Sequence, residues 1–270
     1  WGLAANPRGS RYYWLRVLLQ NPVVFASVSF ILLVCLAGIL APVVAPADPE
    51  FVDPTVRLEG PSSGHLFGTD DLGRDVFSRA VYGARISMLV GITVMVGATA
   101  LGSLIGLVAG YYRWLDNVLM RVMDGLEAFP SILLAIAIMA TFGAATRNVI
   151  LALSVVFAPN VARVVRSTTL MNREQPYVES ARAIGMRDYA ILFRYIFMNS
   201  LSPLIVQATF VIAFGILAEA SLSFLGAGVP PDTPTWGSMV SSGQPRLQQA
   251  CWVSVFPGAF LFATVLAFNL

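Results

Sequence analysis

The chain has 270 residues, of which 57% are hydrophobic and 12% are charged, and its formal net charge is +2. This composition, with a mean hydropathy of +0.73, is typical of a multi-pass membrane protein and excludes an ordinary soluble domain. All 17 basic residues are arginine, so the chain lacks the lysine of a phosphate-binding P-loop and cannot hydrolyse ATP by that route. A net charge this small gives no support for binding nucleic acid.

Six runs of the sequence are long and apolar enough to cross about 30 Å of hydrocarbon as helices. The prediction is an all-α polytopic membrane protein in which residues 1–22 precede the first span and residues 46–84 form a loop rich in turn residues. Residues 85–270 then form a core that holds spans two to six. The six spans are expected near 23–45, 86–110, 118–141, 147–168, 201–225 and 250–270.

The distribution of arginine predicts the orientation of these spans, because cytoplasmic loops carry an excess of basic residues. Six spans place both termini on one side of the membrane. With both termini in the cytoplasm, eleven of the 17 arginines lie inside, four of them within residues 171–199. Residues 1–22 and 171–199 are therefore expected in the cytoplasm, and residues 46–84 outside.

Residues 171–199 form the only long polar interruption in the second half of the chain, and we name them the elbow. Their pattern predicts two short helices that meet at Gly185. Pro176 suits the first turn of a helix, and Gly185 suits the left-handed position that follows a helix end. Asp188 is expected to cap a second helix that runs through Phe197.

The first helix of the elbow has an apolar and a polar side. Val178, Ala181 and Ile184 recur at helical spacing and are expected to hold this helix in place. Glu179 and the neighbouring arginines are expected to face a partner. A membrane protein with such an elbow is expected to offer it to something in the cytosol.

Three carboxylates and a proline are candidates for a polar translocation path. Asp124 and Glu127 share one helix face inside the third span, where a carboxylate is costly unless it faces protein or water. They could instead complement a helix N-terminus, and the sequence leaves both interpretations open. Glu219 near the outer end of the fifth span favours a path-lining or inter-subunit role. Pro130 kinks the third span, either as a hinge or as a static bend.

Two further patterns have simpler interpretations. Gly102, Gly106 and Gly110 recur every fourth residue, which favours close packing of another helix over a role in the path. Residues 60–64 match the G-x-S-x-G pattern of hydrolases and precede His65, the only histidine. That pattern needs a strand–turn–helix elbow, so no nucleophile is expected in this loop. With one histidine and two separated cysteines, no metal site is expected either.

Residues 179–185 (ESARAIG), followed by Leu201, Ser202 and Pro203, resemble the EAA loop of bacterial ATP-binding-cassette importer permeases. Ser180 stands where that motif usually has alanine, and Gly185 is kept. The resemblance implies a type I importer permease fold in which the elbow between spans four and five docks on a cytosolic ATPase. The ATPase-coupling residues that it implies are Tyr177, Glu179, Ser180, Ala181, Arg182, Ala183, Gly185, Met186, Arg187 and Asp188.

Other segments narrow the resemblance to the C-type permease subunit of dipeptide and oligopeptide importers. These segments are residues 67–75, 78–79, 82–85, Asp124 with 128–130, 220–226, 229–231, 235–237 and 268–270, and the resemblance covers nearly the whole chain. It implies an external solute-binding protein. The candidate contacts with that protein are Asp70, Asp71, Arg74, Asp75 and Trp236.

The resemblance implies a non-catalytic permease subunit in a bacterial cell membrane, which forms half of a pathway for di- or oligopeptides. Its partners would be a homologous permease, two ATPase chains or domains that hold ATP and Mg²⁺, and the external binding protein. This chain would bind no cofactor. The same family also carries nickel, glutathione, haem and other solutes, and the rival class is a secondary transporter that needs no ATPase. That rival is disfavoured because no broken spans in matching halves are evident.

Overall fold

The computed structural model describes residues 21–230 and 232–270, so the predicted segment 1–22 lies almost wholly outside the described residues. Within those ranges the chain is helical, and its only β-pairing is an isolated bridge between Thr69 and Asp75. The helices are α2 (Pro22–Ile39), α3 (Ala41–Val44), η1 (Pro54–Val56), α4 (Val76–Tyr111), α5 (Arg113–Glu127), α6 (Ser131–Phe142), α7 (Thr146–Arg173), α8 (Pro176–Ala183), α9 (Asp188–Ile191), the π-helix η2 (Leu192–Phe197), α10 (Met198–Phe224), α11 (Trp236–Gly243), η3 (Gln244–Arg246) and α12 (Trp252–Asn269).

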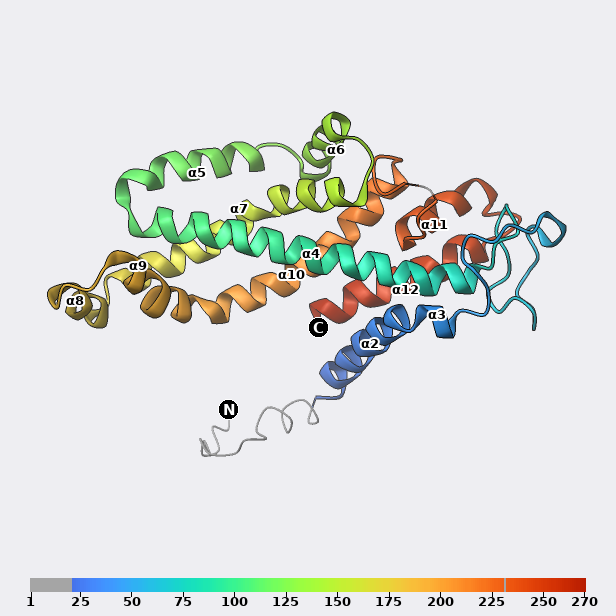
Figure 1. Ribbon diagram of the computed structural model, residues 1–270, viewed down its shortest axis with the longest axis horizontal. Coiled ribbons are helices and arrows are strands. Elements are labelled where there is room, and N and C mark those ends of the chain that lie inside the picture. Colours follow the sequence, from blue (N-terminus) through green and yellow to red (C-terminus); the bar gives the residue numbers. More distant parts are fainter. Residues whose placement is uncertain (1–20, 231) are drawn as a thin grey trace.

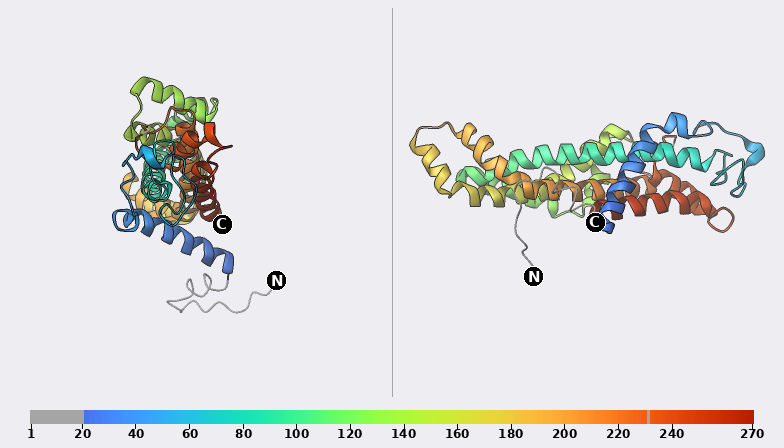
Figure 2. Two further views of the ribbon diagram at one scale, coloured as in Figure 1. Left: turned by 90° about the vertical axis from the view of Figure 1, so that its right-hand side faces the viewer. Right: turned by 90° about the horizontal axis from the view of Figure 1, so that it is seen from below.

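The helices form an elongated bundle (Figure 1). Its elbow end carries α8 and α9, and its opposite end, which we name the loop end, carries residues 45–75 and α11. The end-on view in Figure 2 places α2 on one side of the bundle and α5 and α6 on the other. The 36 residues of α4 span roughly 54 Å, so this helix is longer than the hydrocarbon core is thick. The ends of the bundle therefore project beyond the hydrocarbon.

Five helices in the described part of the chain are long and apolar enough to cross a membrane, and a broken pair would make a sixth. The broken pair is α5 and α6, which meet at an angle of 92°. The predicted span over 118–141 is therefore broken, at the position of the predicted Pro130 kink. The break coincides with Pro130, because a proline disfavours helical geometry at the residue before it, here Phe129.

The second span begins earlier than predicted. The N-cap of α4 is Asp75, whose carboxylate accepts a hydrogen bond of 2.7 Å from the Ser78 backbone N–H. Residues 76–84 are therefore helical and do not belong to a loop. The sequence predicts that this span begins after Arg85, because a charged residue is disfavoured inside a span. The helix nevertheless includes Arg79, which is buried and paired with Asp70.

The glycine pattern on α4 marks its contact with α7, which confirms the packing interpretation. A Cβ atom added to Gly102 would lie 2.7 Å from the Ala158 carbonyl oxygen, and one added to Gly106 would lie 2.5 Å from that of Ala162. Gly110 lies equally close to Thr169. Backbone contact this close needs residues without a side chain. This seam holds the two helices that lead to the elbow end.

Candidate functional site

The first half of the elbow is built as predicted. Pro176 is the first residue of α8, where its missing N–H costs no intrahelical hydrogen bond. After Ala183 the chain turns through Gly185, whose φ is +77°. The Gly185 N–H donates to the Arg182 carbonyl at 2.9 Å, and the Met186 N–H donates to the Ala181 carbonyl at 3.0 Å. These two bonds form a Schellman motif, which closes the helix and fixes the direction of the following segment.

The apolar anchor of α8 consists of two residues and not of three. Val178 and Ala181 are buried in the main hydrophobic core of the bundle. Ile184 is 80% exposed, so the prediction that it holds the helix in place is wrong. The reason is that α8 ends at Ala183, before Ile184 can continue the helical stripe. An exposed isoleucine at the tip of the elbow is available to a partner protein.

The second half of the elbow differs from the prediction. The N-cap of α9 is Arg187, and Asp188 is the first helical residue, so Asp188 does not cap this helix. The helix also does not stop at Phe197, because α9, η2 and α10 form one helix of 37 residues from Asp188 to Phe224. The elbow is therefore continuous with the fifth span through a π-helical segment.

Asp188 instead ties the elbow to the end of α4. Its carboxylate accepts hydrogen bonds from the Tyr111 hydroxyl at 2.6 Å and from the Tyr112 hydroxyl at 3.3 Å. Burial and the neighbouring carboxylate raise the pKa of the Tyr112 phenol, which therefore remains a donor at neutral pH. The Arg182 guanidinium lies 5.1 Å from the centre of the Tyr111 ring, a cation–π contact. Both sides of the Gly185 turn thus contact α4.

The remaining coupling candidates divide by exposure. Ala181 is buried and cannot contact a partner in this conformation, and Met186 is half-buried against the core. The Tyr177 hydroxyl donates to the Asn172 side chain at 2.7 Å, although the ring is partly exposed. The exposed candidates are Tyr177, Glu179, Ser180, Arg182, Ala183, Gly185, Arg187 and Asp188.

Two of the candidate path residues form a charged cluster with α7. The Arg163 guanidinium lies 2.9 Å from the Asp124 carboxylate and also pairs with Glu127. Both acids lie in the last turn of α5, which begins at Arg113, so the interpretation as helix N-terminal charges is wrong. The path role remains a prediction for this cluster. Pro130, three residues beyond Glu127, lies at the break between α5 and α6.

Glu219 lies inside its own chain. Its side chain has no exposed surface, and the Ser223 hydroxyl donates to one carboxylate oxygen at 2.8 Å. The other oxygen has no partner in the described part of the chain. Glu219 therefore does not line an open path in this conformation, contrary to the prediction. The C-terminal part of α10 is instead packed against neighbouring segments of the same chain.

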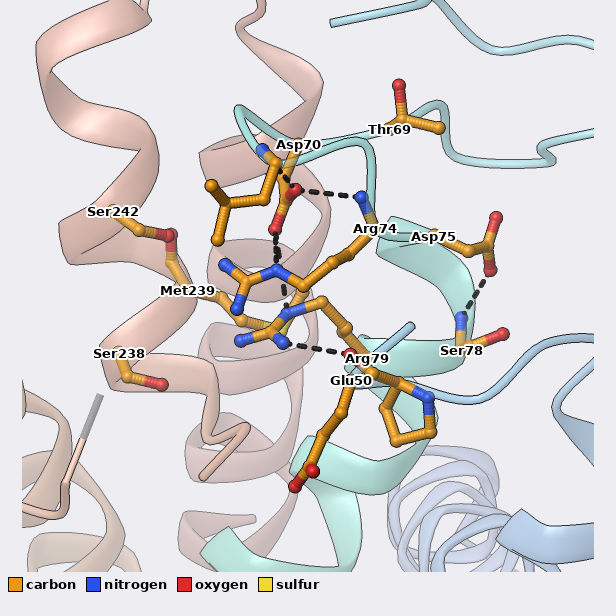
Figure 3. A network of polar contacts seen from close by, with 12 residues as sticks. Glu50, Thr69, Asp70, Arg74, Asp75, Ser78, Arg79, Ser238, Met239 and Ser242 are labelled. Carbon is orange, nitrogen blue, oxygen red and sulfur yellow. Dashed lines mark hydrogen bonds and ion pairs between the residues drawn. The ribbon is translucent and has the colours of Figure 1, made fainter. Parts of the chain in front are cut away.

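A buried charge network organises the loop end (Figure 3). The Arg74 Nε lies 2.7 Å from the Asp70 carboxylate, and the Arg79 Nε lies 3.8 Å from it. Arg79 also donates to the Pro49 carbonyl at 2.9 Å. The Arg79 side chain is buried, and an unpaired guanidinium would be costly in that position. Its pairing with Asp70 offsets this cost. The network joins the segment after α3 to the start of α4.

The predicted contacts with a binding protein are wrong for three residues, because the chain itself buries them. Asp70 and Asp75 have almost no exposed surface, and Trp236 has none. Trp236 Nε1 donates to the Ala80 carbonyl at 3.1 Å, which fixes α11 on α4. The sequence pattern that contains these three residues therefore reflects packing within the loop end. Asp71, which lies 3.7 Å from Arg246, and Arg74 retain some exposed surface.

The G-x-S-x-G segment forms a turn in this loop. The Ser62 hydroxyl oxygen accepts a hydrogen bond from the His65 backbone N–H at 3.2 Å, and the His65 ring contacts the Asp75 carboxylate at 3.0 Å. The segment lies outside any strand or helix. Within the described ranges, no group of three or more His, Cys, Asp or Glu side chains could hold a metal ion.

Sequence reasoning missed the polar ties between α5, α7 and the end of α4. Arg166 binds the Asp116 carboxylate through two hydrogen bonds, of 2.5 and 2.7 Å. Arg173 donates to the Gly110 carbonyl at 2.7 Å. An arginine inside an apolar span was the available signal, because such a group requires a partner. The identity of the partner depends on packing and could not be predicted.

The family model described as "Binding-protein-dependent transport system inner membrane component" matches residues 98–270, which include the elbow and its helices. The chain belongs to this family. It is thus an inner-membrane component of a binding-protein-dependent transport system, and the predicted importer-permease family is confirmed. The matched region begins within α4 and covers every residue of the Asp188 and Arg163 clusters.

Two relatives of this permease extend the match over nearly the whole chain. A dipeptide transport system permease protein of Alkalihalophilus pseudofirmus is 42% identical over 254 residues, which cover 94% of this chain and 84% of that protein. A glutathione transport system permease protein of Escherichia coli O6:K15:H31 is 44% identical over 260 residues, which cover 96% and 86%.

Solved structures confirm the permease fold. An inward-facing form of the MetNI methionine ABC transporter has a TM-score of 0.60 at 18% identity and covers 71% of this chain and 91% of that chain. An amino acid ABC transporter has a TM-score of 0.55 at 15% identity and covers 72% and 90%. The all-α architecture of this permease is therefore that of ABC transporter permeases.

Proposed function

We propose that this permease forms half of the translocation pathway of an ATP-driven importer for short peptides. The peptide substrate is supported by the dipeptide permease that is 42% identical over 94% of this chain. Glutathione is the second candidate, because a glutathione permease has similar identity and coverage. Glutathione is itself a short peptide, so both candidates share the same substrate class.

The observation that carries the coupling role is the division of the elbow into an anchored and an exposed side. Val178 and Ala181 are buried in the hydrophobic core, while Glu179 and Ile184 are exposed at the tip of the elbow. A rigid and partly apolar projection of this kind suits the cleft of a partner protein. The partner is a cytosolic ATPase, and closure of two such ATPases on ATP moves the elbow together with α10.

The rest of the proposed assembly follows from this role. A homologous permease supplies the other half of the pathway, and an extracytoplasmic solute-binding protein delivers the peptide at the loop end. The elbow and both termini face the cytoplasm of a bacterial cell. ATP and Mg²⁺ are bound by the ATPases, and this lysine-free chain binds no cofactor and catalyses no reaction.

Purification and transport test this proposal together. A tagged chain extracted from native membranes is expected to bring down an ATPase and a second permease. The complex in proteoliposomes, with its binding protein, is expected to import labelled dialanine only when ATP is supplied. Isolation without an ATPase would contradict the coupling role. Import of glutathione but not dialanine would assign the second substrate.

A further inference from the structure

A pocket of about 360 Å³ lies between α7 and α10, remote from the elbow and from the loop end. Asn160 is about 20 Å from either end of α7, so the pocket lies about halfway along this candidate membrane span. Two carboxamides and three aromatic rings surround it. The lining residues are Phe157, Asn160, Gln207, Phe210, Val211 and Phe214.

The two carboxamides of the pocket are not used by the fold. Asn160 is exposed and Gln207 is half-buried, and neither side chain makes a hydrogen bond with the described part of the chain. A free carboxamide that faces lipid would lose its hydrogen bonds to water without compensation. This surface therefore faces water, a ligand or another protein.

The exposed face of α7 indicates whether the surface around the pocket faces water, a ligand or another protein. Asn160, Arg163 and Ser167 are exposed and recur at helical spacing, so they form a short polar stripe on α7, in which Arg163 is paired with Asp124 and Glu127 of α5. A lipid-facing helix would not carry such a stripe. Helix–helix contacts in membranes favour small residues, whereas this hollow is lined by Phe157, Phe210 and Phe214. An aqueous path that ends in a ligand pocket fits both observations.

The chemistry of the pocket selects a ligand class. A carboxamide both donates and accepts, so Asn160 and Gln207 together match the C=O and N–H of a peptide group whatever side chains flank it. The aromatic rings offer apolar contact to those side chains. No charged residue lines the pocket. We propose that Asn160 and Gln207 bind the peptide groups of the solute in the translocation path, an inference that rests on the proposed peptide import.

The test uses the complete importer in proteoliposomes, with its binding protein saturated by the probe. The probes are dialanine and dialanine methylated on its peptide nitrogen, which cannot donate. Wild type is expected to import dialanine about tenfold faster than the methylated probe. The double variant Asn160→Leu/Gln207→Leu is expected to import dialanine about tenfold more slowly and to lose the preference between probes. The amide-conserving variant Asn160→Gln/Gln207→Asn should retain import.

Thr209→Val is the matched control, because this α10 hydroxyl donates to the Val206 carbonyl of its own helix and lies outside the pocket. Wild-type rates and preference in the double leucine variant would overturn the inference while leaving peptide import intact. If the double variant loses its partner permease on size-exclusion chromatography, the amides belong to the subunit interface and the inference is wrong. If wild type imports neither dialanine nor glutathione, peptide import and the pocket assignment fail together.

Discussion

At the scale of single residues, the elbow depends on a backbone conformation and on one carboxylate. Gly185 adopts φ of +77°, and no atom lies within 4 Å of where its Cβ would be. Glycine is therefore required by conformation and not by lack of space. The Asp188 carboxylate accepts hydrogen bonds from the Tyr111 and Tyr112 hydroxyls at the end of α4. These two bonds orient the segment that follows the Gly185 turn.

Substitutions at Gly185 distinguish a requirement for the left-handed backbone conformation from a requirement for a small side chain. Gly185→Val is expected to destabilise the turn by about 1–2 kcal/mol or more, because a β-branched residue is disfavoured in the left-handed region. Peptide import per ATP hydrolysed should fall in the reconstituted complex. Gly185→Asn is the control, since asparagine tolerates this conformation and the site is open. Equal coupling in the valine variant would argue against a role for the turn.

The tyrosine contacts of Asp188 can be tested separately. Tyr111→Phe removes the shorter hydrogen bond, to a charged acceptor, and is expected to lower the local stability of the elbow by about 1–3 kcal/mol. Hydrogen exchange of the amides in α8 and α9 should become faster. Tyr112→Phe should have a smaller effect, because its bond is longer and exposed. Unchanged exchange in the Tyr111 variant would show that this hydrogen bond does not stabilise the elbow.

At the scale of elements, the seam between α4 and α7 and the continuity of α9 with α10 position the elbow. The glycine seam lets α7 follow α4 closely up to the elbow end, where Arg173 reaches the Gly110 carbonyl. The helix from Asp188 to Phe224 then leads back through the membrane. The second half of the elbow and Gln207 therefore lie on the same helix.

Overpacking of the seam tests its contribution to stability. Gly106→Ala is expected to cost about 1–3 kcal/mol, because its added Cβ would lie 2.5 Å from a backbone carbonyl that cannot move aside freely. The melting temperature of the detergent-solubilised protein should fall. The matched control is Gly125→Ala on α5, where no atom lies within 4 Å of the added Cβ. A melting temperature that is unchanged by Gly106→Ala would contradict the packing account.

Local signals predicted some of these features and not others. Pro176, Gly185 and the α4 glycines were predictable, because each satisfies a rule that involves only neighbouring residues or helix spacing. Ile184 and Asp188 were misassigned because their roles depend on where α8 stops and on the position of α4. Asp70 and Trp236 were misassigned because burial depends on how distant segments pack. A carboxylate or tryptophan in a loop does not reveal this from sequence.

At the scale of the whole molecule, α7 and α10 both run from the elbow end into the bundle (Figure 1). The pocket lined by Asn160 and Gln207 lies between these two helices. Gln207 lies 19 residues beyond Asp188 along one continuous helix, or roughly 28 Å. One continuous helix therefore connects the elbow to the pocket. In the proposed importer, nucleotide-driven motion enters at the elbow and changes access to the peptide path.

Site-specific photo-crosslinking tests most directly whether the tip of the elbow contacts the ATPase, as proposed. A photo-crosslinking phenylalanine analogue is placed at Ile184, which is 80% exposed, and as a control at Phe51, which is 64% exposed at the loop end. Irradiation of native membranes is expected to give a covalent adduct of this chain with an ATPase from position 184 and none from position 51. A complex that contains the ATPase but yields no such adduct from position 184 would contradict the account.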